Sequence, residues 1–128
     1  GRLAMWDHVQ AADAATAVIA MIEDAEAIDR IEAIMAVEGL DGVFMGRADL
    51  SLALKAAGPD AEPVKLATER VTAAARAAGK VVSALAAGAS DARWLRELGV
   101  SALVVSSDQG LLRQAALRAL ADFQDLGD

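Results

Sequence analysis

Four short apolar runs, each followed by a stretch of helical periodicity, are the feature of this sequence that most restricts its fold. The runs cover residues 17–22, 42–45, 81–85 and 102–105, and none of them alternates strictly between apolar and polar side chains. Continuous apolar runs of this length are typical of strands that are buried on both faces of a sheet. Strands that alternate with helices pair in parallel through crossover connections. The sequence therefore predicts an α/β fold of four parallel βα units.

The stretches between the runs predict amphipathic helices, because their apolar residues recur at intervals of three and four. The first helix is expected to begin after Asp24, which is a suitable capping residue. The second is expected to start at Pro63 and to end at Gly79. The third is expected to start at Ser90 and to end at Gly99, and a last helix follows the fourth run.

Four βα units are compatible with two architectures. One is a small open sheet with helices on both faces, and the other is half of a (β/α)₈ barrel, which has about 250 residues when complete. An open sheet of the receiver type needs a lysine after a fifth strand, and this chain offers neither. We treat residues 1–128 as a single α/β domain in which residues 1–13 form a lead-in segment to the first strand.

The bulk composition narrows the range of partners. Hydrophobic residues make up 55% and charged residues 24% of the 128 residues, which is a globular composition. The net charge of −7 argues against a nucleic-acid partner, and the absence of cysteine excludes a thiolate metal site. The longest apolar run, residues 14–22, is far shorter than the roughly 20 residues that span a bilayer. We therefore expect a cytoplasmic protein with no nucleic-acid and no membrane partner.

Two carboxylates follow adjacent strands of the predicted sheet. Glu23 comes directly after the first run, and Asp49 lies in the segment after the second run, 26 residues further on. Neighbouring parallel strands lie about 5 Å apart, so their carboxyl ends bring these residues to one edge. Carboxylate oxygens suit Mg²⁺ or Mn²⁺, and the backbone N–H groups around Gly46 and Ala48 can bind an anion. This edge is the candidate functional site.

Each of these residues also has a purely structural interpretation. An aspartate after a strand is often a helix cap, which applies to Asp24, Asp49 and Asp108, and a glutamate there is often simply solvated. Arg47 can either meet a carboxylate or remain a solvated loop charge. His8 is the only histidine, and we expect it at the surface without a role.

The segments around these carboxylates resemble the core of the HpcH/HpaI aldolase/citrate lyase family. The similarity is carried by residues 20–24 and 37–51 and continues through residues 77–80, 97–99 and 107–112. A strand that ends in Ile-Glu, followed by the aspartate of a Gly-x-Ala-Asp-Leu-Ser segment, forms a compound signal that neither part gives alone. The resemblance covers nearly the whole chain from about residue 14.

This resemblance implies a class II pyruvate aldolase. The family fold is a TIM barrel of eight βα units, and the four units of this chain would correspond to its strands five to eight. The family binds Mg²⁺, Mn²⁺ or Co²⁺ through positions that match Glu23 and Asp49. The segment that matches Gly46, Arg47 and Ala48 contacts the pyruvate carboxylate through backbone N–H groups. The implied reaction is the retro-aldol cleavage of a 4-hydroxy-2-oxo acid to pyruvate and an aldehyde, through a metal-stabilised enolate.

The sequence departs from the family pattern in three ways. Met21 stands where a glutamine is common, and Arg47 replaces the usual proline. The first four βα units of the barrel, which supply a histidine for proton transfer and an arginine for the pyruvate oxygen, have no counterpart here. We therefore assign no catalytic residue within this half, and a metal site without those partners would be slow or silent.

An isolated half barrel would have two bare strand edges and an exposed inner face. We therefore expect a chain that belongs to a longer gene product, or one completed by an N-terminal half, or a homo-oligomer. The family barrels are commonly hexamers in which the last helix packs across subunits, and residues 111–123 would suit that arrangement. The alternative to an aldolase is a non-catalytic half-barrel module that oligomerises and binds a small anion.

Overall fold

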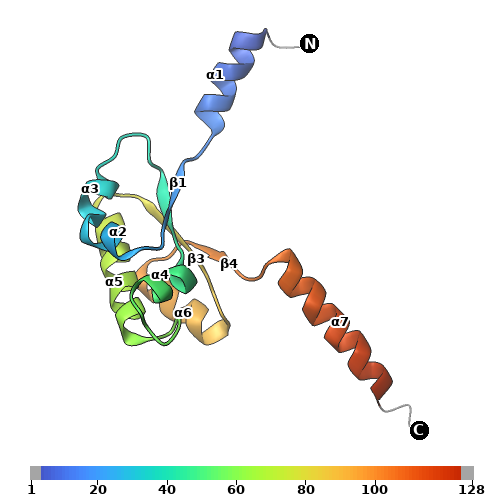
Figure 1. The fold of residues 1–128 in the computed structure, drawn as a ribbon. Coiled ribbons are helices and arrows are strands. Elements are labelled where there is room, and N and C mark those ends of the chain that lie inside the picture. The colour runs from blue at the N-terminus through green and yellow to red at the C-terminus, as the bar shows by residue number, and fades with distance from the viewer. Residues whose placement is uncertain (1–3, 125–128) are drawn as a thin grey trace.

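A computed structural model describes residues 4–124 and contains one four-stranded sheet with helices on one of its faces (Figure 1). In chain order the elements are α1 (Met5–Ala15), β1 (Ile19–Ile22), α2 (Ala25–Asp29), α3 (Ile31–Met35), β2 (Gly42–Met45), α4 (Arg47–Ala53), α5 (Glu62–Ala77), β3 (Val81–Leu85), α6 (Ala89–Leu98), β4 (Ala102–Val104) and α7 (Asp108–Gln124).

The sheet is parallel throughout, with strand order β1-β2-β3-β4, as the alternation of runs and helices predicts. In the register, Ile22 lies beside Met45, and Met45 lies beside Ala84. All four predicted runs form strands, although β1 begins at Ile19 rather than at residue 17 and β4 ends at Val104. The prediction of four parallel βα units is confirmed.

One face of the sheet is covered by helices and forms the core. Side chains such as Ile22, Val43 and Ala84 are buried there. The helix α5 lies against β2 and β3 and also contacts the other covering helices, α2, α3, α4 and α6. Its Val64 and Val71 are fully buried, as the apolar spacing of this segment predicts.

The opposite face of the sheet is open in the described part of the chain. Its side chains alternate with those of the core face, and they remain exposed to a similar extent: Ile19 45%, Met21 56%, Val81 46%, Leu85 47% and Val104 40%. The expectation of strands buried on both faces is therefore wrong for residues 4–124, because these residues supply covering helices to one side only. Apolar side chains on both faces of a singly covered sheet are what one half of a barrel would contain.

Two helices extend away from the sheet (Figure 1). The helix α1 occupies most of the predicted lead-in segment, and α7 follows β4. Neither helix has a buried residue. Within residues 4–124, no helix is long and apolar enough to cross a membrane.

The helix boundaries confirm most of the expected caps. The Asp24 carboxylate accepts a hydrogen bond from the Ala27 N–H at 2.7 Å, Pro63 lies in the first turn of α5, and Gly99 ends α6 with a φ of +101°. The expectation that Ser90 caps the third helix is wrong. The helix α6 starts at Ala89 with Gly88 at the cap position, so Ser90 already lies inside the first turn.

Candidate metal and substrate site

The carboxyl ends of β1 and β2 bring the predicted site residues to one edge of the sheet. The Gly46 N–H donates a hydrogen bond to the Ile22 carbonyl at 2.9 Å, so Glu23 lies beside Gly46 in the continuing register. The segment after β2 was expected to be a loop, but α4 begins at once with Arg47. Asp49 is therefore held in the first turn of a helix.

Gly46 leaves the space that the Glu23 side chain occupies. A Cβ atom at position 46 would lie 2.8 Å from the Glu23 Cβ and 3.2 Å from Glu23 Oε2. It would also lie 3.4 Å from the Met21 Cγ, which belongs to the open face of the sheet. Glu23 thus continues the open face beyond the end of β1, and its carboxylate lies against the turn that leads into Asp49.

Glu23 and Asp49 differ from most other acidic residues near this edge in having no structural partner. Among residues 4–124, neither carboxylate takes part in a hydrogen bond or an ion pair. By contrast, Asp24 caps α2, and the Asp108 carboxylate accepts a hydrogen bond from the Gln109 N–H at 2.8 Å. The structural interpretation as a helix cap therefore holds for Asp24 but does not describe Asp49.

The two carboxylates could supply part of the ligand shell of a hard divalent cation. Glu23 and Asp49 supply carboxylate oxygens, which Mg²⁺ and Mn²⁺ prefer. Residues 4–124 contain no group of three or more acidic, histidine or cysteine side chains that could hold a metal ion. A cation held by these two residues would thus take its other ligands from water and substrate, as Mg²⁺ commonly does.

A cavity of about 350 Å³ lies over the same edge. It is lined by the predicted residues Gly46, Arg47, Ala48 and Asp49, while Glu23, which lies against Gly46, is not part of its lining. The remaining wall is mainly apolar. The residues that complete the lining are Met21, Phe44, Met45, Pro59, Asp60, Leu85 and Ala87.

The Arg47 side chain is directed into the protein. It is only 6% exposed, and its guanidinium donates from Nη1 to Asp91 Oδ1 at 3.0 Å and from Nη2 to Asp91 Oδ2. The same Nη2 donates to the Leu85 carbonyl at 2.9 Å, and the guanidinium carbon lies 5.8 Å from the centre of the Trp94 ring. The interpretation of Arg47 as a solvated loop charge is wrong, and the carboxylate that it meets belongs to the protein.

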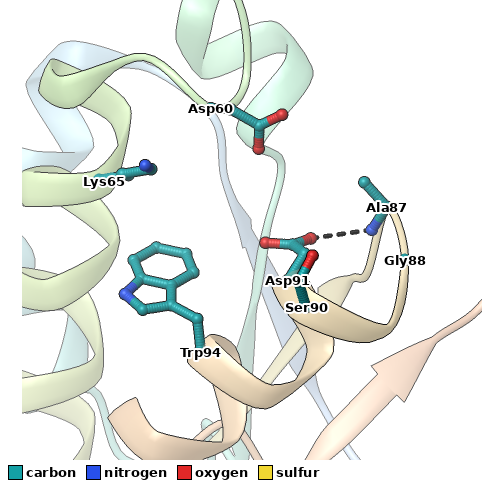
Figure 2. Close-up of a pocket in the computed structure, with 7 residues that line it drawn as sticks. All are labelled: Asp60, Lys65, Ala87, Gly88, Ser90, Asp91 and Trp94. Carbon is teal, nitrogen blue, oxygen red and sulfur yellow. Dashed lines mark hydrogen bonds between the residues drawn. The ribbon is translucent and has the colours of Figure 1, made fainter.

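Asp91 lies at the start of α6, next to a second cavity of about 350 Å³ that Lys65 and Trp94 also line (Figure 2). Figure 2 shows its carboxylate turned toward Ala87, whose N–H donates to Oδ2 at 2.8 Å. Burial raises the pKa of Asp91, but the hydrogen bonds from Arg47 and Ala87 and the charges of Arg47 and Lys65 outweigh it. The pKa of this carboxyl therefore lies below its ordinary value.

Sequence analysis missed Asp91 and its link to Arg47. The two residues are 44 positions apart, so no local pattern joins them. The available signal was the placement of both residues just after neighbouring strands, β2 and β3, whose ends meet at one edge of a parallel sheet.

Comparisons with known proteins point to one protein family. The HpcH/HpaI aldolase/citrate lyase family matches residues 5–115. A hydroxypyruvate/pyruvate aldolase of Delftia acidovorans is 41% identical over 88 residues, which are 68% of this chain and 33% of that protein. A 5-keto-4-deoxy-D-glucarate aldolase of Escherichia fergusonii is 38% identical over 88 residues, 68% of this chain and 34% of that protein.

The fold is shared with a solved HpcH/HpaI aldolase/citrate lyase family protein from Burkholderia cenocepacia. The TM-score is 0.83 at 36% identity, and the match covers 93% of this chain and 47% of that one. This chain therefore spans about a third of the curated relatives and about half of the solved structure. Its four-stranded parallel sheet thus shares the fold of part of a TIM-barrel-type aldolase. With the family match over most of its length, the chain belongs to the HpcH/HpaI aldolase/citrate lyase family.

Proposed function

We propose that this protein takes part in the divalent-metal-dependent cleavage of a 4-hydroxy-2-oxo acid to pyruvate and an aldehyde. The observation that carries the proposal is the pair of unpartnered carboxylates, Glu23 and Asp49, at the carboxyl edge of the sheet beside Gly46. Family membership supports the aldolase or lyase class. The names of the relatives, a hydroxypyruvate/pyruvate aldolase and a 5-keto-4-deoxy-D-glucarate aldolase, support a substrate of the oxo-acid class.

In this proposal Glu23 and Asp49 hold the metal, for which Mg²⁺, Mn²⁺ and Co²⁺ are the candidates. The bound metal supplies Lewis acidity to the keto oxygen of the substrate. Gly46 keeps the space beside Glu23 open, because any larger residue would collide with that side chain. The backbone N–H groups of Arg47 and Ala48, which have no intrahelical acceptor, bind the substrate carboxylate. Met21, Phe44 and Leu85 form an apolar wall that limits water around these polar groups.

The proposal assigns no proton-transfer residue to this chain. The family resemblance puts a histidine and an arginine with those roles in the first half of the barrel. We therefore propose that full activity needs that half, supplied by a longer form of the chain or by a complementing partner. The bare edges of β1 and β4 are the places where such a half would continue the sheet.

The experiment is the exchange of the pyruvate methyl protons in D₂O, followed by NMR with Mn²⁺ or Mg²⁺ and with a metal-free control. We expect metal-dependent exchange in the full-length protein and its loss in Glu23→Ala and Asp49→Ala, together with weaker Mn²⁺ binding. The matched control is Asp24→Asn, which removes a neighbouring charge but keeps a capping side chain. Unchanged Mn²⁺ affinity in both alanine variants would refute the assignment of the ligands.

A second candidate function is a non-catalytic half-barrel module that oligomerises and binds a small anion. The observation in its favour is the open sheet face, where Ile19, Met21 and Val81 are about half exposed and suited to a protein contact. A stable dimer of the chain that shows no metal-dependent exchange of pyruvate protons would favour this module over the aldolase.

A further inference from the structure

The contacts of Arg47 tie together three elements that surround the candidate site. Arg47 is the first residue of α4, the carbonyl of Leu85 is the last of β3, and Asp91 lies in the first turn of α6. The guanidinium donates to both carboxylate oxygens of Asp91 and to the Leu85 carbonyl. One side chain therefore joins the start of α4 to the end of β3 and to the start of α6.

This connection is buried and geometrically specific. The exposed fractions are 6% for the Arg47 side chain and 14% for that of Asp91. A planar guanidinium that meets a carboxylate through two parallel hydrogen bonds fixes both distance and orientation. The Ala87 N–H holds the Asp91 carboxylate from the other side, and the Trp94 ring covers the guanidinium. The pair thus has one well-defined arrangement.

Asp49 depends on the position of the same helical turn. It lies two residues after Arg47 in α4, and its own side chain is exposed and makes no contact that would orient it. The buried Leu50 anchors the inner side of α4, and the Leu50 N–H donates to the Gly46 carbonyl at 2.9 Å. The other polar contacts at the start of this helix are a hydrogen bond from the Gly46 N–H to the Ile22 carbonyl at 2.9 Å, one from Ser51 Oγ to the Ala48 carbonyl at 2.6 Å, and a 3.8 Å approach of the exposed Asp60 to Arg47. None of them ties α4 to β3 or α6, as the Arg47 guanidinium does.

We infer that Asp91, acting through the Arg47 guanidinium, is a positioning residue that sets the place of Asp49 and of the Gly46–Ala48 backbone at the candidate site. This inference rests on the proposed function, since it concerns the metal ligand Asp49. It assigns Arg47 a second role beside its backbone N–H group, and it assigns Asp91 a role that requires no contact with substrate. Groups of this kind, one step removed from a ligand, commonly change metal affinity when they are lost.

The test compares Mn²⁺ affinity and stability in Asp91→Asn, Arg47→Gln and the double variant of the full-length protein. We expect each single variant to bind Mn²⁺ about 10-fold more weakly or worse, while it remains fully folded at the assay temperature. The double variant should be no weaker than Arg47→Gln alone, because both changes break the same connection. Arg47→Lys keeps the charge but not the paired geometry and should recover only part of the affinity.

The matched control is Arg70→Gln, which removes an exposed arginine that lies 3.5 Å from Glu32. Its Mn²⁺ affinity should equal that of the unchanged protein. A merely structural role of the Arg47–Asp91 pair would lower stability and leave the Mn²⁺ affinity of the folded variants within 2-fold of the unchanged protein. That outcome would overturn this inference and leave the proposed function untouched.

Hydrogen exchange keeps the inference separate from the proposed function. The protection of the Leu50 N–H reports how firmly the first turn of α4 is held, and it needs no metal. We expect faster exchange at Leu50 in Asp91→Asn than in Arg70→Gln. If the unchanged protein binds no Mn²⁺, the proposed function fails, and exchange at Leu50 still decides whether Asp91 holds this turn. Unchanged exchange in Asp91→Asn would contradict the positioning role.

Discussion

The two faces of the sheet are built by the same strands from similar side chains, but only one of them forms a core. On β1, Ile22 is 1% exposed on the covered face, and Ile19 is 45% exposed on the open face. The difference lies in what packs against each face, since α2, α3, α5 and α6 all cover the same side (Figure 1). An apolar strand residue therefore contributes to stability through its partners and not through its own hydrophobicity.

The largest expected effect on stability tests the contrast between the covered and the open face directly. Ile22→Ala should lower the free energy of unfolding by about 2–5 kcal/mol, because it removes a fully buried side chain and leaves a cavity. Ile19→Ala, the same change on the same strand, should cost about 1 kcal/mol or less, since its side chain is already half in water. Urea unfolding monitored by circular dichroism measures both. Equal losses would mean that the open face is covered in solution.

The next expected effect distinguishes two glycines of the open face, Gly42 and Gly46, by whether substitution changes Mn²⁺ binding as well as stability. A Cβ at Gly42 would lie 2.5 Å from the Val81 carbonyl oxygen, and a Cβ at Gly46 would lie 2.8 Å from the Glu23 Cβ. Both alanine variants should lose about 1–3 kcal/mol of stability through overpacking. Only Gly46→Ala should also weaken Mn²⁺ binding, because only there is the displaced group the proposed ligand. Parallel titrations with Mn²⁺ make the distinction, and equal Mn²⁺ affinity in both variants would contradict the role of Gly46.

A smaller effect concerns acid stability. The pKa of Asp91 is lower in the folded than in the unfolded chain, so the folded state is favoured above the unfolded value near 3.8. That contribution should be lost as the pH falls through the lower folded pKa. Asp91→Asn should therefore be less stable than the unchanged protein at pH 6, and the gap should close at low pH. Unfolding midpoints between pH 6 and pH 2.5 measure this, and a constant gap would show that Asp91 does not act through its charge.

The smallest expected effect on stability concerns the solvent-exposed ion pair between Arg30 and Glu26. Arg30 and Glu26 approach to 2.7 Å, yet their side chains are 71% and 73% exposed. Arg30→Ala should change the free energy of unfolding by about 0.5 kcal/mol or less, since solvent screens such pairs. Thermal unfolding at low and high salt provides the measurement. A loss as large as that of Arg47→Gln would remove the contrast between exposed and buried pairs.

The sequence allowed the strands, most helix ends and the edge that carries the site to be predicted. Continuous apolar runs identified the strands, while Pro63 and Gly99 marked helix boundaries through backbone geometry that is local and strong. Parallel pairing then required that residues after β1 and β2 meet at one edge. That Glu23 and Asp49 bind metal remains a prediction.

What could not be predicted depends on contacts between distant parts of the chain. The break between α2 and α3 at Arg30 and the early start of α4 at Arg47 follow no strong local signal. The pairing of Arg47 with Asp91 needs the relative placement of α4 and α6, which the residues themselves do not encode in a local pattern. Periodicity likewise cannot tell which face of a strand finds a partner, so the open face was expected only from the absence of the other half of the barrel.

The close approach of Glu23 to Gly46 also restricts the order in which positions 23 and 46 can be substituted during evolution. Any side chain at position 23 has a Cβ, and a second Cβ at position 46 would approach it to 2.8 Å without a backbone shift. Filling position 46 while Glu23 remains therefore requires a backbone shift, so Gly46 is costly to vary in a lineage that keeps Glu23. A lineage that first loses Glu23 to glycine becomes free to fill position 46. Restoring the carboxylate without strain then takes two substitutions in a fixed order, first the return of Gly46 and then that of Glu23, so the return is harder than the loss.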